Sequence, residues 1–291
     1  MPLLQRTETP NLLCISIVCY ETAEEVLLKT VASAIRAIQS LLVKESDAKT
    51  SVVLVNNNRL NRLALSAFSA LETEFTSAKC KLTLIQGHGN VGYGQGHNLA
   101  FYAQPSRYHL FMNPDVEMES DCLILGLSYL RENIDTGIVS PYVTNFGGEK
   151  QFLCKRYPSV FDFYLRGFAP RAVQKKLNAR LDNYEMRDVS ELEPTRNIPI
   201  VSGCFMLCDS EVIGRISGFD PQYFLYFEDF DLSMRVNKIS SIAYLPSMRI
   251  KHYGGNTAKK GLKHIVFFVR SGIRFFNTYG WRWFKTHDDG Y

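Results

Sequence analysis

The first part of the chain alternates between short apolar runs and segments whose apolar positions follow a helical spacing. The run LLCISIVCY at 12–20 favours a strand, and Thr22-Ala-Glu-Glu25 follows it as a capping-box signature for a helix start. Apolar residues then recur at helical spacing, at Leu27, Val31, Ala34, Ile35, Ile38, Leu41 and Leu42. The pattern predicts a strand followed by a helix.

The same alternation continues to about residue 131. It predicts strands at 51–55, 81–85 and 108–112, and helices at 61–70, 94–103 and 120–131. Strands that alternate with helices predict an α/β fold with a parallel sheet that is covered on both faces. In such a sheet, ligands bind at the carboxyl ends of the strands.

Polar or glycine-rich turns follow all four predicted strands. They are Tyr20-Glu21, Asn56-Asn57-Asn58, QGHGNVG at 86–92 with Asn90 and Gly92, and NPDVE at 113–117. Asn and Gly are also good turn formers, so one such turn alone would say nothing about function. Four of them at the same edge of one sheet favour a ligand site there.

The alternation breaks down between about residues 148 and 198. Lys, Arg and aromatic residues are mixed through this region, which predicts two short helices and a mobile loop that could form an acceptor wall. The sheet is expected to resume at 198–208 and to end with short strands near 242–245 and 248–252. We expect one domain at 1–256, with halves at about 1–120 and about 121–256.

Residues 257–291 are expected to form a C-terminal basic helical extension, with a helix at 259–278. One apolar stripe runs along this helix, Lys263, Arg270 and Arg274 lie off it, and Trp281 and Trp283 follow. A basic amphipathic helix with tryptophans suits a membrane surface that carries anionic lipids. The stripe could equally pack on the domain. Both readings stay open.

The charge distribution and the cysteines indicate the cellular compartment and the partners of the protein. The net charge of +4 hides nine Lys and Arg without any Asp or Glu between Arg249 and His287, against 24 basic and 29 acidic residues elsewhere. Seven scattered cysteines without a C-x-x-C pair favour a reducing cytoplasm over a disulfide framework or a zinc knuckle. No secretory signal and no membrane-spanning run are expected. No nucleic-acid partner is expected either.

The segment from Gly218 to Arg235 (GFDPQYFLYFEDFDLSMR) places carboxylates among Phe, Tyr and Leu. Carboxylates in such surroundings cost free energy unless they are paired, bind metal or line a wet cleft. Asp229 is expected to cap a helix at 230–238 and to act as a general base. The alternative is that Glu228 and Asp229 only cap this helix and pair with Arg235.

Two loops at the predicted sheet edge could each bind a ligand. Gly87-His-Gly89-Asn-Val-Gly92 matches the dinucleotide pattern G-x-G-x-x-G, but two strand–helix units come before it, which argues against a dehydrogenase. Pro114 ends a strand, so Asp115 is expected to point out of the sheet edge. Asp115, with Glu117 and His252 nearby, could hold Mg²⁺ or Mn²⁺. A type I turn that is capped by Asp115 is the alternative.

An ordered set of motifs resembles family 2 glycosyltransferases of the GT-A fold, and among them bacterial rhamnosyltransferases of polysaccharide assembly. The motifs are Val55-Asn-Asn-Asn58, Asn90-Val-Gly92 with Gly96 and Asn98, Phe111-Met-Asn-Pro-Asp115, Val201-Ser-Gly203 with Met206, Gly218-Phe-Asp220, Phe224 through Glu228-Asp229 to Asp231-Leu232 and Arg235, and His252-Tyr-Gly-Gly255. The resemblance covers roughly residues 12 to 275 and implies a mostly parallel central sheet flanked by helices, with a helical insertion. It also implies a nucleotide-binding half at about 1–120 and an acceptor-side half at about 121–256.

The resemblance also implies an inverting sugar transfer from a nucleotide diphosphate donor. It assigns the base to Asp229 beside Glu228, and the metal, Mg²⁺ or Mn²⁺, to Asp115 and His252. The donor is expected at Tyr20, Glu21, Asn56, Asn57, Asn58, Asn90, Gly92, Asn113 and Arg235. Asn56 and Asn113 stand where many members carry Asp, which predicts a modest metal affinity.

The leading hypothesis is a cytoplasmic enzyme that moves a sugar, such as L-rhamnose, from a dTDP- or UDP-activated donor. The acceptor would be a lipid-linked glycan at the inner face of the membrane. A sugar-phosphate nucleotidyltransferase would share the phosphate-binding sheet edge but would form a sugar nucleotide. A catalytically silent glycan-binding subunit is the third alternative.

Overall fold

A computed structural model describes residues 11–167, 169–254 and 261–284. The first half contains β1 (Asn11–Cys19), α1 (Glu24–Lys44), β2 (Thr50–Asn56), a 3₁₀ helix η1 (Leu65–Leu71), α2 (Glu72–Ser77), β3 (Cys80–Gln86), α3 (Tyr93–Ala103), β4 (Ser106–Met112), β5 (Val116–Met118) and α4 (Cys122–Glu132). Strands β1 to β4 and helices α1, α3 and α4 were predicted, and β5 was not. Strands β3, β2, β1 and β4 lie side by side in this order, and all pairs between them are parallel. The parallel half of the predicted sheet is therefore confirmed.

The second half completes the sheet with mixed strand directions. It contains β6 (Thr136–Thr144), β7 (Lys150–Gln151), β8 (Cys154–Lys155), β9 (Ile200–Val201), β10 (Phe205–Asp209), α8 (Ser210–Arg215), α9 (Glu228–Val236) and β11 (Ser241–His252). The sheet continues from β4 through β10, β6 and β11 to β5, and β7 pairs with β6. Strand β10 is antiparallel to both of its neighbours, while β6 and β11 are parallel to each other.

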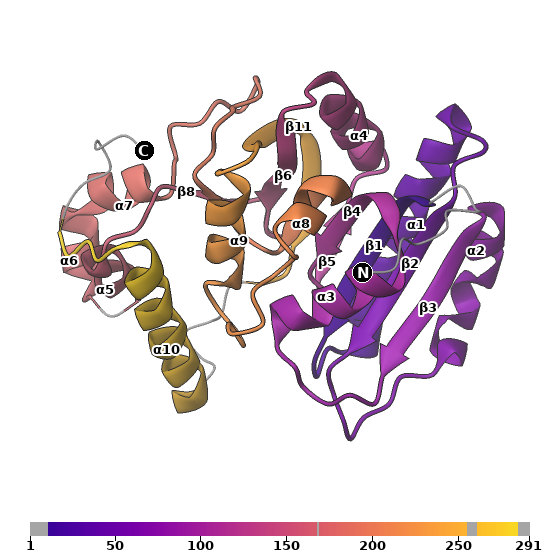
Figure 1. The fold of residues 1–291 in the computed structure, drawn as a ribbon, viewed down its shortest axis with the longest axis horizontal. Coiled ribbons are helices and arrows are strands. Elements are labelled where there is room, and N and C mark those ends of the chain that lie inside the picture. The colour runs from indigo at the N-terminus through magenta and orange to yellow at the C-terminus, as the bar shows by residue number, and fades with distance from the viewer. Residues whose placement is uncertain (1–10, 168, 255–260, 285–291) are drawn as a thin grey trace.

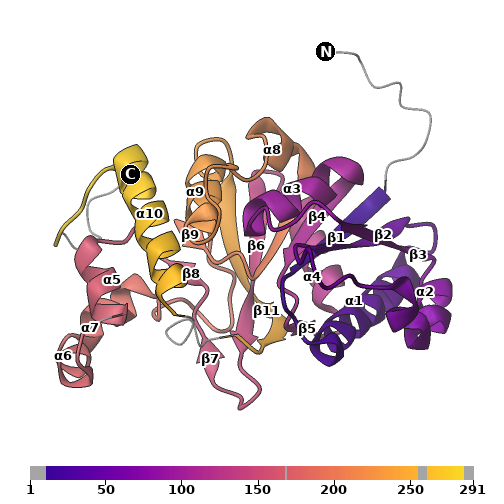
Figure 2. The same ribbon diagram turned by 90° about the horizontal axis from the view of Figure 1, so that it is seen from below.

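Helices cover both faces of this sheet (Figures 1 and 2). Helices α1, α2 and α4 lie on one face, and α3, α8 and α9 lie on the other. The larger core lies under α1 and α4, where Leu27, Ile35 and Leu127 are buried against strand residues such as Leu110 and Leu207. Burial on both faces explains why the central strands are continuous apolar runs.

Several predicted boundaries are wrong. The helix expected at 61–70 is replaced by a loop, a 3₁₀ helix η1 (Leu65–Leu71) and α2 (Glu72–Ser77). The side-chain oxygen of Asn58 accepts hydrogen bonds from the backbone of Leu60 and Asn61, which favours a turn instead of a helix start. The two short strands expected near the end of the sheet are one strand, β11, with a bulge between Leu245 and Arg249.

The insertion after β8 contains three short helices where two were expected: α5 (Val160–Gly167), α6 (Arg171–Lys176) and α7 (Asn178–Tyr184). The C-terminal helix α10 (Leu262–Tyr279) lies beside α5 in both ribbon views. The predicted domain boundary at residue 256 and the predicted helix start at residue 259 lie outside the described residues.

All seven cysteines are buried free thiols. In the described part of the chain, α1 is the one helix with the length and hydropathy of a membrane span, and half of its apolar window is buried inside the protein. Its buried positions, among them Leu27, Val31 and Ile38, are part of the main core.

Candidate active site

Asp229 lies in the first turn of α9, where backbone N–H groups hold its carboxylate. Its Oδ2 accepts from the backbone of Gly203 at 2.9 Å and its Oδ1 from the backbone of Phe230 at 2.9 Å. The predicted helix start at Phe230 is wrong, because α9 begins at Glu228 and Phe227 precedes it in a left-handed conformation. A carboxylate in the first helical turn is stabilised by the positive end of the helix dipole.

Glu228 and Asp229 differ in their surroundings. Glu228 is only 5% exposed, and its Oε2 has no hydrogen-bond partner among the described residues. Burial and the neighbouring Asp229 charge raise the pKa of Glu228 well above its ordinary value. Burial also raises the pKa of Asp229, but the N–H groups of Gly203 and Phe230 oppose this rise. Of the two carboxyl groups, Asp229 is therefore the one that carries the negative charge.

Two consecutive aromatic residues before Glu228 adopt positive φ angles, Tyr226 at 67° and Phe227 at 64°. Such conformations cost of order 1–3 kcal/mol each in residues other than Gly, and the surrounding structure must enforce them. Phe227 is enclosed by Phe163, Phe230 and residues of α10, and the Tyr226 hydroxyl contacts His264 Nδ1 at 2.9 Å. Helix α10 therefore helps to hold the turn that presents Glu228 and Asp229.

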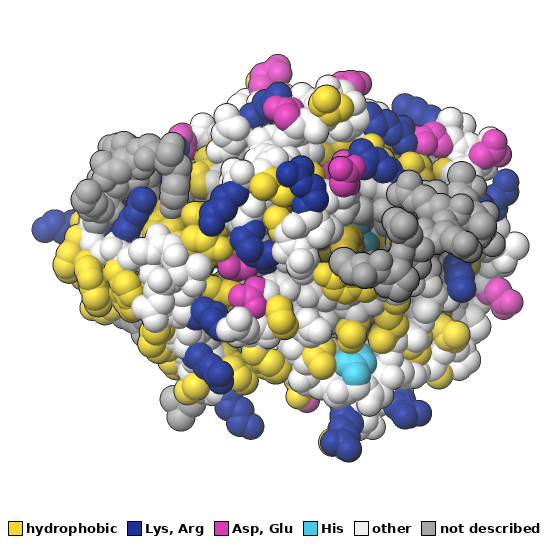
Figure 3. Space-filling model, viewed as in Figure 1, with side chains coloured by type: hydrophobic (Ala, Val, Ile, Leu, Met, Phe, Trp, Pro, Cys, Tyr) yellow, Lys and Arg dark blue, Asp and Glu magenta, His cyan; other side chains and the backbone are white. Residues whose placement is uncertain are grey.

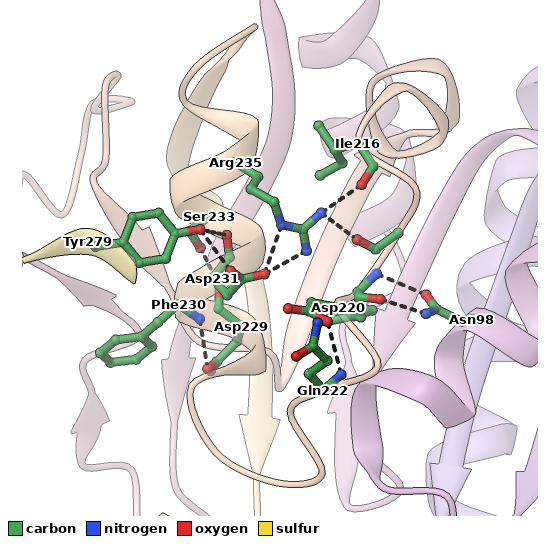
Figure 4. Close-up of polar contacts among 12 residues, drawn as sticks. Asn98, Ile216, Asp220, Gln222, Asp229, Phe230, Asp231, Ser233, Arg235 and Tyr279 are labelled. Atoms are coloured by element: carbon green, nitrogen blue, oxygen red, sulfur yellow. Dashed lines mark hydrogen bonds and ion pairs between the residues drawn. The ribbon is translucent and has the colours of Figure 1, made fainter. Parts of the chain in front are cut away.

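Arg235 does not pair with Glu228 or Asp229, so the predicted pairing is wrong (Figure 4). That the two carboxylates only cap the helix stays an alternative. Its guanidinium donates to Asp231 Oδ2 at 2.8 Å and to the carbonyl groups of Ile216 and Gly218, both at 2.7 Å. Tyr279 of α10 donates its hydroxyl hydrogen to the other oxygen of Asp231 at 2.7 Å. These contacts tie α9 to the loop before residue 219. A donor contact by Arg235 stays a prediction.

Asp115, Asn113 and His252 come together at the other side of the site. His252 Nε2 lies 3.4 Å from Asp115 Oδ1 and 3.3 Å from Asn113 Nδ2. A ring nitrogen and a carboxylate oxygen this close can ligate one divalent cation. Glu117, which was also considered, instead contacts the Tyr253 hydroxyl at 3.3 Å. Within the described residues, no group of three or more His, Cys, Asp or Glu could hold a metal ion.

Gln151 orients the His252 ring by contacting Nδ1, the nitrogen that does not face Asp115. Its Nε2 donates to the carbonyl groups of His252 at 3.4 Å and Gly254 at 3.1 Å, so its Oε1 is the atom that faces His252 Nδ1 at 3.0 Å. An acceptor at Nδ1 favours the tautomer with hydrogen on Nδ1, which leaves the Nε2 lone pair directed toward Asp115. The residues present therefore fit a divalent cation with two protein ligands.

A short segment between β9 and β10 hydrogen-bonds to the Asp229 carboxylate and to the backbone of Asn113, two residues before Asp115. Gly203 donates its N–H to Asp229, and the next residue, Cys204, accepts the N–H of Asn113 at 2.9 Å. A Cβ on Gly203 would lie 3.2 Å from the Asp229 Cβ atom and 3.2 Å from the Tyr93 ring, so both groups pack closely against this backbone. Neither carboxylate is sealed in the core, because Asp229 is half-buried and the Asp115 side chain is 27% exposed.

The predicted donor loops are ordered by their own amide side chains. Asn56 bonds the Asn61 carbonyl at 2.8 Å, and Asn57 bonds the Gly92 carbonyl at 2.9 Å. Asn90 accepts the N–H of Gly92 at 3.0 Å. Gly92 has φ of +89°, and a Cβ there would lie 2.1 Å from the Phe224 carbonyl oxygen. The loop after β3 is thus packed against the segment that leads to Asp229.

The remaining predicted donor residues, Tyr20 and Glu21, are exposed at the end of β1, and Glu21 has a positive φ of 54°. Roles for all these residues in donor binding stay predictions. Sequence reasoning missed two residues that support the site, Gln151 and Tyr93. The Tyr93 hydroxyl donates to the Gly203 carbonyl at 2.5 Å. No local pattern marks either residue, because both act on partners that are about 100 residues away.

This fold is that of GT-A glycosyltransferases. The structure of GalNAc-T7 with UDP, GalNAc and Mn²⁺ matches it with a TM-score of 0.60 and 13% identity, over 93% of this chain and 48% of that one. The expected fold class is therefore confirmed.

Relatives in sequence are rhamnosyltransferases. The chain is 23% identical to the rhamnosyltransferase WbbL of Escherichia coli over 177 residues, which are 57% of this chain and 62% of WbbL. It is 33% identical over 78 residues to the N-acetylglucosaminyl-diphospho-decaprenol L-rhamnosyltransferase of Mycobacterium tuberculosis, which are 26% of this chain and 25% of that enzyme. The matches thus span less than two thirds of either relative. No family model matches the chain. The comparisons support a glycosyltransferase.

Proposed function

We propose that the protein is an inverting glycosyltransferase of family 2 that moves a sugar from a nucleotide diphosphate donor to a hydroxyl group of a glycan acceptor. One observation carries the proposal: the Gly203-Cys204 segment holds Asp229 on one side and the Asn113–Asp115 turn on the other. A candidate base and a candidate diphosphate-binding turn thus hydrogen-bond to one short segment, which supports a single-step displacement.

Asp229 is the base in this proposal. Its carboxylate removes the proton from the acceptor hydroxyl while that oxygen attacks the anomeric carbon of the donor sugar. The bond from this carbon to the diphosphate breaks on the opposite face, so the configuration inverts. Burial and the neighbouring charge raise the pKa of Glu228 well above its ordinary value, which favours the negative charge on Asp229.

The leaving diphosphate gathers negative charge as the bond breaks. Asp115 and His252 would hold a Mg²⁺ or Mn²⁺ ion, which when bound neutralises that charge. Asn113 lies beside both ligands and brings no charge of its own. With only one carboxylate in the pair, the ion would be held largely by the donor's diphosphate oxygens, in keeping with a modest affinity of the free protein for metal.

The relatives favour L-rhamnose as the sugar and a lipid diphosphate-linked glycan as the acceptor. In this proposal the donor is activated by dTDP or UDP, and the enzyme acts at the inner face of the cell membrane.

A screen for thermal stabilisation by UDP, dTDP and GDP, each with Mn²⁺, identifies the nucleotide, because a ligand of the native state raises its stability. Transfer from the matching sugar nucleotide is then followed by release of nucleotide diphosphate and by NMR of the product anomer. An inverted product supports the proposal. A retained configuration, or a sugar nucleotide formed from nucleoside triphosphate and sugar phosphate, contradicts it.

A further inference from the structure

Helix α10 has an aromatic inner face that packs on Leu225–Phe227, the turn before Glu228. Phe275 and Phe276 are buried and lie 5.4 and 6.5 Å from Phe227, ring centre to ring centre. Ser271 donates to the Leu225 carbonyl at 2.9 Å, and a Cβ on Gly272 would lie 3.2 Å from the Phe227 ring. This face therefore has its partner inside the protein.

The outer face of the same helix exposes aliphatic side chains. Ile265, Val266, Val269 and Ile273 are between 44% and 61% exposed. Their spacing places them in one stripe beside the buried Phe276, while Phe275 lies on the other side of the helix. The chain then continues into Trp281, Trp283 and Phe284, which are also exposed. Figure 3 shows hydrophobic side chains gathered at the end of the molecule where α10 lies. An apolar surface of this kind marks an interaction site.

Positive charge borders this apolar row. Lys263 and Arg270 are exposed on α10, each about one helical turn from Val266. Helix α6 at the same end of the molecule adds the exposed Lys175 and Lys176. The sequence from Arg249 to His287 contains no Asp or Glu, so α10 itself carries no acidic side chain. Aliphatic and tryptophan side chains beside exposed cations match the interface of a bilayer with anionic headgroups.

We propose that the outer face of α10, together with Trp281–Phe284, docks the protein on a bilayer that contains anionic lipids. The aliphatic row enters the boundary between headgroups and acyl chains, and the cations contact lipid phosphates. Because the inner face of α10 packs on the turn before Glu228, docking holds Asp229 at a fixed height above the headgroups. This inference deepens the proposed function. Its link to a lipid-linked acceptor rests on that proposed function.

The first test is flotation of the full chain with phosphatidylcholine vesicles, with and without phosphatidylglycerol, and without donor or acceptor. We expect at least tenfold stronger binding to the vesicles that contain phosphatidylglycerol, and weaker binding at high salt. The double substitution Val269→Glu with Ile273→Glu should abolish binding. Val43→Glu on α1 is the matched control, since Val43 is 88% exposed on another helix, and should bind as the unchanged protein does.

A second pair of variants keeps the apolar row. Lys263→Gln and Arg270→Gln should each weaken binding about fivefold, in line with the contribution of one cation near an anionic surface. The proposal is overturned if the unchanged protein ignores phosphatidylglycerol or if the double variant floats equally well. It is also overturned if the double substitution instead converts a dimer into a monomer.

Turnover with a soluble, short-chain acceptor separates this proposal from the proposed function. The double variant should keep that turnover, because both side chains are exposed and the contacts of α10 with the turn before Glu228 are made by other residues. Vesicle binding without any sugar transfer would refute the proposed function and leave the docking surface in place.

Discussion

The most informative substitution outside the predicted site is Gln151→Leu. It removes the acceptor that lies 3.0 Å from His252 Nδ1 and the donor that reaches the carbonyl groups of His252 and Gly254. The ring then loses the contact that sets its tautomer and its orientation toward Asp115. Loss of such a supporting contact weakens metal affinity by about 10- to 100-fold, which corresponds to about 1.4–2.7 kcal/mol.

The assay is Mn²⁺ binding by electron paramagnetic resonance in the presence of the nucleotide diphosphate, so it does not depend on turnover. Gln151→Glu keeps an acceptor for the Nδ1 hydrogen and should retain more affinity than the Leu variant. Gln39→Leu is the control, since Gln39 makes an exposed side-chain bond to Ser77 far from the site. Equal Mn²⁺ affinity for Gln151→Leu and the unchanged protein would refute the proposed role of Gln151.

Three further predictions concern the support of the site and of the insertion. Tyr93→Phe leaves the Gly203 carbonyl without its partner, which should lower the free energy of unfolding in urea by about 1–3 kcal/mol. It should also lower kcat more than it changes KM. Unchanged kinetics would show that Tyr93 does not support the position of Asp229. Gly92→Ala should destabilise by more than about 1 kcal/mol, because its Cβ would overlap the Phe224 carbonyl oxygen; unfolding at the unchanged urea midpoint would contradict the packing. Burial lowers the pKa of Lys155 to about 7 from 10.5, so between these pH values the unfolded chain binds more protons and stability should rise with pH. Lys155→Met should remove this rise, and an unaltered pH profile of unfolding would exclude Lys155 as its source.

The parallel half of the fold could be predicted because its strands are buried on both faces. Strands such as β2 read as unbroken apolar runs, and the helical spacing of α1 is clear over 21 residues. The convergence of Asp115 and His252 was also predicted, since both lie at strand ends that meet at one sheet edge.

The antiparallel part was harder to predict. Strand β6 contains Pro141 and was not recognised, and β5 is only three residues long. Whether β10 runs parallel or antiparallel depends on pairing with β4 and β6, which lie far away in the sequence. Local patterns carry no information about such pairing.

The partners of individual side chains could not be predicted from the sequence either. Asp231, four residues before Arg235 on the same helix, is the partner that Arg235 takes, but the sequence offered Glu228 and Asp229 just as well. The contacts of Gln151 and Tyr93 span 101 and 110 residues. Only the folded chain brings these groups together.

The central claim is that Asp229 acts as the base at a donor site shared with Asp115. The most direct test is Asp229→Asn, with donor affinity measured by calorimetry and turnover measured under saturating donor and acceptor. Donor affinity should stay nearly unchanged while kcat falls on the order of 100-fold or more. Turnover equal to that of the unchanged protein would contradict the claim.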